Sequence, residues 1–178
     1  MAGSRVLEIL RDIEADTFRH AASLPAKRDT RAQWQGLGFQ VGGVRLASAI
    51  GQVSEILAVP RVTRLPRVKD WILGIANVRG RLVPLVDLHR YLGVATTTPR
   101  VQWRVLVVDT PVARVGLVVE QSLGLQHFVA ESFEEGRPDG LPALQPFVDG
   151  AYRHGGRMFY LVRLSDLVQD ERFNQVAQ

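Results

Sequence analysis

Apolar and polar residues alternate along most of the chain after residue 37, in short stretches separated by turns that contain glycine or proline. Alternation with a period of two is typical of β-strands that bury one face, and glycine supplies the positive φ angles of tight hairpin turns. The pattern predicts four hairpins, at residues 37–48, 74–86, 105–120 and 151–162. The chain is therefore expected to be mostly β, with short helices between these units and at its ends.

The segments between the hairpins are less regular. Residues 49–57 are expected to continue as a strand, with Ile50 facing inward and Val53 and Ile56 as further inward candidates. Residues 130–146 are rich in glycine, proline and acidic residues, which predicts a long surface loop.

The end of the second hairpin carries helix signals. Pro84 cannot donate a ladder hydrogen bond, so its strand is expected at a sheet edge or with a bulge. Asp87 is placed to cap a short helix at residues 88–92, and Gly93 is placed to end it. A closing helix is expected at about residues 165–173.

Residues 1–36 differ from the rest and predict a helical arm. Ser4 is a candidate N-cap, and Pro25 disfavours helical geometry in the residue before it. The apolar residues that recur near helical spacing are Val6, Ile9, Leu10 and Ile13. This helix either covers the body of its own chain or docks on a partner, and the pattern leaves both open.

A twenty-residue segment occurs twice, at residues 74–93 and 150–169, without a gap between the copies. Six positions are identical, among them a Gly-Arg pair at the predicted hairpin turn. The six matched pairs are Gly74 and Gly150, Gly80 and Gly156, Arg81 and Arg157, Leu85 and Leu161, Val86 and Val162, and Leu88 and Leu164. The pattern indicates two versions of one supersecondary unit.

Composition limits what the chain can be. With 178 residues and 46% apolar residues, it can form one domain, or two small ones that share a core. It has no cysteine, which excludes disulfides and thiolate metal sites, and no apolar segment approaches the ~18 residues that cross a bilayer. We therefore expect a cytoplasmic protein without membrane insertion.

No catalytic motif stands out. The four histidines lie far apart in the sequence, and we find no nucleophile elbow, phosphate-binding loop or paired-carboxylate motif. The net charge of +4 comes almost entirely from arginines, which are scattered along the chain. Metals, cofactors and catalytic residues are therefore not expected.

The order of motifs resembles the CheW-like coupling domain of bacterial chemosensory arrays. Val53-Ser54-Glu55-Ile56 is similar to the family's V-x-E-I segment, and residues 74–88 are similar to its Gly-Ile-x-Asn-x-Arg-Gly hairpin and Val-Pro-x-Val-Asp-Leu strand. Residues 114–120 resemble a later strand, although Glu120 replaces the usual aspartate, and His89 and Tyr91 also depart from the pattern. The long N-terminal arm and Trp34-Gln-Gly-Leu-Gly-Phe39 are more similar to the PilI branch, which is attached to type IV pilus twitching motility.

This resemblance implies a fold of two five-stranded SH3-like β-barrels related by a pseudo-twofold axis, with short helices and an N-terminal helical arm. The CheW-like domain would cover residues 37–173, with subdomains at about 37–95 and 100–173 that can exchange strands. Such proteins have no catalytic activity. They link the cytoplasmic tips of methyl-accepting receptors to a histidine kinase, whose regulatory domain has the same fold and makes a like-for-like barrel contact. A groove between the barrels takes the receptor hairpin.

Five residues are candidates for partner binding. Arg79 on a hairpin turn can reach a partner carboxylate, Val78 would add apolar area, and Gly80 would permit the turn. Glu55 and Val53 are the complementary candidates, because acidic residues are disfavoured in strands unless exposed. Without the resemblance, Arg79 reads as an ordinary solvated turn residue. Glu55 either contacts a partner or marks the solvent-facing side of its strand, and the sequence leaves both open.

A nucleic-acid-binding small β-barrel is the alternative function. Arg61, Arg64, Arg67 and Lys69 cluster in one predicted loop, as a phosphate-binding surface would require. The loop lacks the interleaved aromatic residues on which bases stack. We therefore expect no nucleic-acid partner.

Overall fold

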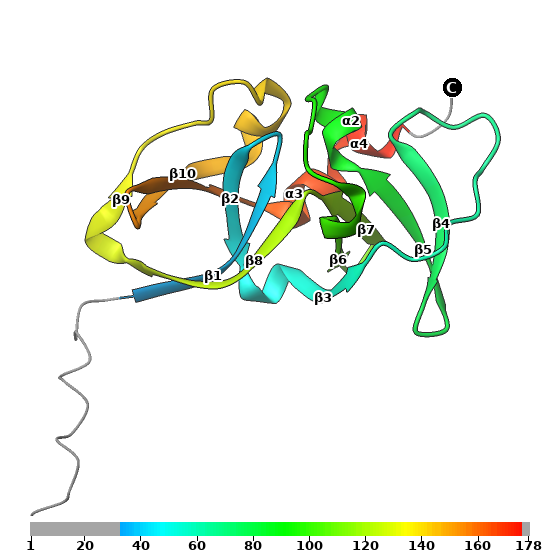
Figure 1. Ribbon diagram of the computed structural model, residues 1–178, viewed down its shortest axis with the longest axis horizontal. Coiled ribbons are helices and arrows are strands. Elements are labelled where there is room, and N and C mark those ends of the chain that lie inside the picture. Colours follow the sequence, from blue (N-terminus) through cyan, green and yellow to red (C-terminus); the bar gives the residue numbers. More distant parts are fainter. Residues whose placement is uncertain (1–32, 176–178) are drawn as a thin grey trace, which may run out of the picture. The chain divides into compact units, whose positions relative to one another are not determined.

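Residues 33–175, which the computed structural model describes, form two β-sheets with short helices (Figure 1). The prediction of a mostly β chain is confirmed. The helix predicted within residues 1–36 lies outside the described residues, except that residues 33–36 belong to the first strand.

The sheets differ in strand number. The strands of the first sheet are β1 (Gln33–Val41), β2 (Val44–Ala49), β8 (Gln121–Val129), β9 (Phe133–Glu134), β10 (Val148–His154) and β11 (Arg157–Val162). Those of the second are β3 (Val53–Ala58), β4 (Ile72–Val78), β5 (Arg81–Asp87), β6 (Arg104–Asp109) and β7 (Arg114–Val119). The α-helices are α2 (Leu88–Leu92), α3 (Leu164–Gln169) and α4 (Glu171–Asn174), and the 3-10 helices are η1 (Ile50–Gln52), η2 (Arg100–Gln102), η3 (Ala130–Ser132) and η4 (Pro142–Phe147). The first sheet thus has six strands where five were expected, because β9 adds to its edge.

Both sheets follow one plan. The order is β8-β1-β2-β11-β10-β9 in the first and β3-β6-β7-β5-β4 in the second, and each contains two antiparallel hairpins joined by one parallel pair. Strand β10 pairs on its outer side with the short edge strand β9. The equivalent strand β4 forms on its outer side a single β-bridge, between Ile75 and Thr63. The repeated segment occupies matching places, since β4, β5 and α2 begin 76 residues before β10, β11 and α3.

Each sheet takes strands from both halves of the chain. The N-terminal hairpin β1-β2 completes the first sheet, whose other strands all follow residue 120, while β3 crosses to the second sheet. Residues 95–100 therefore separate strands that belong together. The largest core cluster contains residues of both sheets, such as Phe39 and Leu46 from one and Leu106 and Leu117 from the other. The two sheets thus share one core.

The strand β1 begins four residues earlier than expected. Trp34 lies within it, with its ring centroid 5.4 Å from Phe128 and 5.3 Å from Tyr152. Its partner β8 was not predicted, because its burial does not follow a regular alternation. Register and aromatic packing across the pair, rather than local pattern, place both strands.

Matched glycines in the repeat allow a close approach between strands. At Gly74, where φ is 133°, an added Cβ would lie 2.1 Å from the carbonyl oxygen of Thr63. At Gly150 it would lie 2.4 Å from the ring of Phe133 and 2.9 Å from the carbonyl oxygen of Glu134. Only glycine leaves room for the chain that crosses here, which explains why both copies keep it.

Pro84 lies in the interior strand β5, so its expected place at a sheet edge is wrong. The N–H and C=O of its partner Ile75 bond Thr63 on the far side, and the parallel pairing with β7 begins only at Leu85. The proline nitrogen therefore sits where the ladder requires no donor. A bulge between Ile72 and Gly74 lies in the neighbouring strand.

A buried network around Glu120 connects the two sheets. Its carboxylate accepts hydrogen bonds from Gln40 Nε2 at 2.9 Å and from the N–H of Gly42 at 3.0 Å, both in the β1-β2 hairpin. His89 Nε2 lies 3.5 Å from Glu120 Oε1, and His89 Nδ1 lies 3.2 Å from Asp87 Oδ1. Glu120, His89 and Asp87 are each at most 3% exposed.

Asp87 also caps α2, as predicted, by accepting from the N–H of His89 at 3.1 Å and of Arg90 at 3.3 Å, and Gly93 ends the helix in the left-handed conformation. Burial opposes ionisation of both carboxyls, but the hydrogen bonds and the nearby His89 hold the pKa of Asp87 and of Glu120 below their ordinary values. Both groups therefore favour the folded state in their ionised form.

The lowered pKa values predict acid sensitivity. A carboxyl whose pKa is depressed by folding stabilises the protein above its unfolded pKa, and this stabilisation is lost as the pH falls through the folded value. We expect the free energy of unfolding, measured by urea denaturation, to decrease below about pH 4.

Glu120→Gln should lower the free energy of unfolding at pH 7 by about 1–3 kcal/mol, since an amide cannot satisfy all the donors around it. It should also flatten the decrease in acid. A variant as stable as the parent with the same acid profile would show that the network does not hold the sheets.

Candidate functional site

An ion pair brings together two residues that the sequence analysis proposed separately. Arg79 Nε lies 2.8 Å from Glu55 Oε1, and the side chains are 82% and 16% exposed. Arg79 is on the β4-β5 turn and Glu55 is on β3, at opposite ends of the strand order of the second sheet. The sheet is therefore curled enough for its two ends to meet, and the guanidinium stays open to a partner.

Arg79 adopts a backbone conformation that is costly for it. Its φ is +51°, in the left-handed region, and the equivalent position in the other copy of the repeat is Gly155, with φ +56°. A residue with a Cβ pays roughly 1–2 kcal/mol for this conformation. Backbone strain of this kind is often retained at binding sites, where the side chain compensates for it.

The neighbours of Arg79 have different roles from those expected. Val78 is 3% exposed and packs in the core cluster inside the second sheet, so its predicted contribution to an apolar contact surface is wrong. Alternation along β4 turns Val78 inward when Asn77 faces out. Gly80, with φ +80°, permits the turn, and its N–H donates to Asn77 Oδ1 at 2.8 Å. Asn77 therefore orders the turn that presents Arg79, a role the sequence analysis missed.

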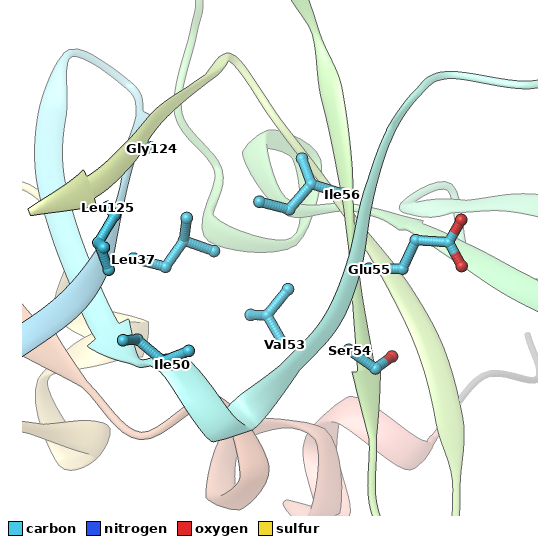
Figure 2. A pocket seen from close by; sticks show the side chains of 8 residues that line it. All are labelled: Leu37, Ile50, Val53, Ser54, Glu55, Ile56, Gly124 and Leu125. Carbon is cyan, nitrogen blue, oxygen red and sulfur yellow. The ribbon is translucent and has the colours of Figure 1, made fainter.

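An apolar groove of about 400 Å³ lies beside this pair, between the edge strands β3 and β8 (Figure 2). We call it the interstrand groove. The residues that line it are Leu37, Ile50, Val53, Ser54, Glu55, Ile56, Gly124 and Leu125. Val53 and Ile56 point into it, whereas Glu55 points to the other side of its strand, toward Arg79 (Figure 2). The groove and the ion pair thus lie on opposite sides of the same strand, β3.

A bulge in β3 creates this arrangement. The register of β3 against β6 shifts between Val53 and Glu55, so Ser54 is an extra residue. In a regular strand Val53 and Glu55 would share a face; the bulge instead puts Val53 and Ile56 on the same side. Ser54 Oγ donates to the carbonyl of Val107 at 3.1 Å, which anchors the extra residue.

The expectation that Ile50 and Ile56 face the core is therefore wrong. Ile50 lies in η1 instead of a strand and is 47% exposed, and Ile56 is 42% exposed. Leu125, on the unpredicted strand β8, is 52% exposed across the groove. Val53, which the sequence analysis named as a binding candidate, is half-buried and lines the groove. The sequence analysis did not identify Ile50, Ile56 and Leu125 as surface residues, because sequence alone does not show which apolar residues stay uncovered.

The basic loop offers little to the nucleic-acid alternative. Arg64 and Lys69 line one local cavity of about 350 Å³, which Arg61 and Arg67 do not line. Aromatic residues do not line this cavity, so bases have no platform on which to stack there. Among the described residues, no group of three or more histidines and acidic residues is arranged to hold a metal ion. None of the helices in residues 33–175 is long and apolar enough to cross a bilayer.

Comparison with known proteins identifies the family of this chain. The sequence profile of the CheW-like domain matches residues 35–172. The chain is 41% identical over 170 residues to the protein PilI of Pseudomonas aeruginosa, which covers 96% of this chain and 95% of PilI. The chain belongs to the CheW-like domain family. The predicted recognition, including its similarity to the PilI branch, is confirmed.

Two further proteins are similar to this chain. The protein FrzA of Myxococcus xanthus is 33% identical over 145 residues, covering 79% of this chain and 88% of FrzA. The crystal structure of the scaffolding protein TtCheW from Thermoanaerobacter tengcongensis superimposes with a TM-score of 0.68 at 20% identity, over 84% of this chain and 96% of that one. This CheW-like protein therefore has the predicted adaptor class of function, with the interstrand groove and the Arg79–Glu55 pair as its candidate site.

The Arg79–Glu55 pair should contribute little to stability. An exposed ion pair is worth up to about 1 kcal/mol, and the left-handed backbone costs Arg79 a similar amount. We expect Arg79→Gly to change the free energy of unfolding by less than about 1 kcal/mol, measured by urea denaturation.

Arg153→Gly is the matched control for this variant. It also removes an exposed ion pair, with Glu134 at 3.0 Å, but at a strand position without a positive φ, and should be the more destabilising of the two. If Arg79→Gly were the more destabilising, the pair would be structural.

Proposed function

We propose that this protein is a non-enzymatic adaptor that couples the cytoplasmic tips of methyl-accepting receptors to the regulatory domain of a histidine kinase. The output we propose is type IV pilus twitching motility. The observation that carries the proposal is the interstrand groove, with an exposed charged pair on the other side of the same strand, β3. An apolar surface bordered by polar groups and one anchoring charge is what a protein–protein contact requires.

The groove suits the receptor. A receptor tip is a helical hairpin, and a helix presents apolar side chains on one face that can enter an apolar groove. The large apolar side chains of Ile50, Ile56 and Leu125 are exposed at the groove. Contact between such a cluster of apolar side chains and water is unfavourable unless a partner covers them. The groove lies between two edge strands, so a docked hairpin would contact both sheets.

The Arg79–Glu55 pair suits a charged anchor. The Arg79 side chain is 82% exposed, and its guanidinium has donors beyond its contact with Glu55 that can bind a partner carboxylate bidentately. For the kinase we propose a like-for-like contact between its regulatory domain and one of the two curled sheets, which we interpret as SH3-like barrels related by a pseudo-twofold axis. The shared strand plan of the two sheets supports this interpretation.

The pilus branch is supported by the similarity to PilI, which extends over nearly the full length of both chains. We place the adaptor in the cytoplasm, at the inner face of the membrane through receptor arrays. We expect each contact between the adaptor and a partner to be weak, and many copies of the adaptor in one array would supply avidity.

Arg79→Glu tests the charged anchor. The substitution reverses the charge on an exposed turn and places two carboxylates together, so association should weaken about tenfold or more, as for an interface hot spot. Tagged protein would be used to recover kinase and receptor from cells, with circular dichroism and melting as the check on folding.

Arg157→Glu is the matched control, because it makes the same charge change in the β10-β11 hairpin. Arg157 begins β11, which is the equivalent of β5 in the other sheet. It should retain both partners. If Arg79→Glu melts like the parent and recovers as much kinase and receptor, Arg79 is not the anchor.

Leu125→Ser tests the groove. The residue is 52% exposed, so the fold should tolerate the change, while recovery of the receptor should decrease several-fold and that of the kinase should not. Val112→Ser, at a residue that is 76% exposed and outside the groove, is the control. Equal receptor recovery by both variants would place the receptor elsewhere.

A further inference from the structure

A second cavity, of about 350 Å³, is lined by four basic residues. Arg64 and Lys69 come from the loop before β4, Arg90 comes from α2, and Arg100 comes from η2. Asp70 is the only acidic residue in its lining. We call it the basic cavity. Its lining shares no residue with the interstrand groove.

Most of the positive charge at the basic cavity is not neutralised by acidic side chains of residues 33–175. Arg90 Nε lies 3.5 Å from Asp87 Oδ2, and Arg90 also donates to the carbonyl oxygen of Asp70 at 3.1 Å. Arg64, Lys69 and Arg100 have no carboxylate within 4.0 Å among residues 33–175. Three unpaired cations around one concave surface repel one another, so an anion bound there would be stabilised by all of them.

Two of these cations are held in place by aromatic rings. The ammonium of Lys69 lies 5.7 Å from the ring centroid of Trp71, and the guanidinium of Arg100 lies 5.2 Å from that of Trp103. Such cation–π contacts restrict long side chains without neutralising their charge. A ligand therefore meets charges that are already positioned, which lowers the entropic cost of binding.

We propose that the basic cavity binds a small organic phosphate. A phosphate group carries more negative charge than a single carboxylate, and a guanidinium binds it bidentately while lysine contributes a point charge. The cavity also has an apolar wall formed by Leu65, Val68, Ile72 and Leu73, and its volume exceeds what a bare phosphate fills. The charged side thus selects the phosphate, and the apolar wall contacts the organic part.

The arrangement of the basic residues favours a small ligand over a nucleic-acid strand. Arg61 and Arg67 lie in the same loop but do not line the cavity, so the four basic residues of this loop do not form one continuous track. The ligand is therefore recognised at one point by converging charges from three elements. This binding does not depend on the proposed adaptor contacts, which use other residues.

The test titrates the full-length protein with pyrophosphate and with adenosine diphosphate by calorimetry at physiological salt. We expect saturable one-to-one binding, tighter for the diphosphate ester than for pyrophosphate because of the apolar wall. Arg64→Ala/Lys69→Ala should weaken both at least tenfold with an unchanged melting temperature. Arg61→Ala/Arg67→Ala removes the same charge from the same loop and should bind as the parent does.

Three outcomes would overturn the proposal. The first is no binding of either compound at millimolar concentration. The second is equal weakening in the two double variants, which would show only a response to net charge. The third is a loss of protein partners in Arg64→Ala/Lys69→Ala without phosphate binding by the parent, which would assign the cavity to acidic side chains of a partner protein.

Discussion

The buried carboxylate of Glu120 joins the two sheets where they share a core, and it fixes the β1-β2 hairpin against the second sheet. It follows β7 of the second sheet and accepts hydrogen bonds from the β1-β2 hairpin of the first, while His89 connects it to Asp87 and α2. A charge so deeply buried is tolerated only when its neighbours satisfy it, so the hairpin has one acceptable position. His89 and Glu120, at which the sequence analysis noted departures from the family resemblance, lie 3.5 Å apart at Nε2 and Oε1. The longer side chain of glutamate reaches a hairpin turn and a histidine together.

With the sheets fixed in this way, binding features can be placed at their edges. The bulge at Ser54 rotates β3 so that Val53 and Ile56 line the interstrand groove while Glu55 meets Arg79. Neither the exposed apolar residues nor the left-handed backbone of Arg79 favours the folded chain by itself. Both are understandable in an adaptor, whose surfaces are completed by its partners.

The fold places arginines that are scattered along the sequence in different surroundings. Arg153 and Arg163 each lie against a carboxylate on the surface, where such pairs contribute little. Arg64 and Arg100, with Lys69, converge on the basic cavity without an acidic partner among the described residues. Arg90 belongs to both settings, because it contacts Asp87 of the buried network and lines the cavity. Charge distribution, more than net charge, therefore distinguishes the surfaces of this protein.

The sequence by itself determined the local features: the hairpins around their glycine turns, the Asp87-capped helix, the repeated unit and the family. These depend on neighbours a few residues apart, such as the two glycines of a turn or Asp87 and the N–H of Arg90. The candidates Arg79 and Glu55 were also found in the sequence, but not their contact, which spans 24 residues. Tertiary structure alone decided that β1-β2 completes the sheet of the C-terminal strands, that Ile50 and Ile56 stay exposed, and that Val78 is buried. The reason is that an apolar side chain is core or surface according to which distant strand covers it, and pairing between distant strands leaves no mark in the local alternation.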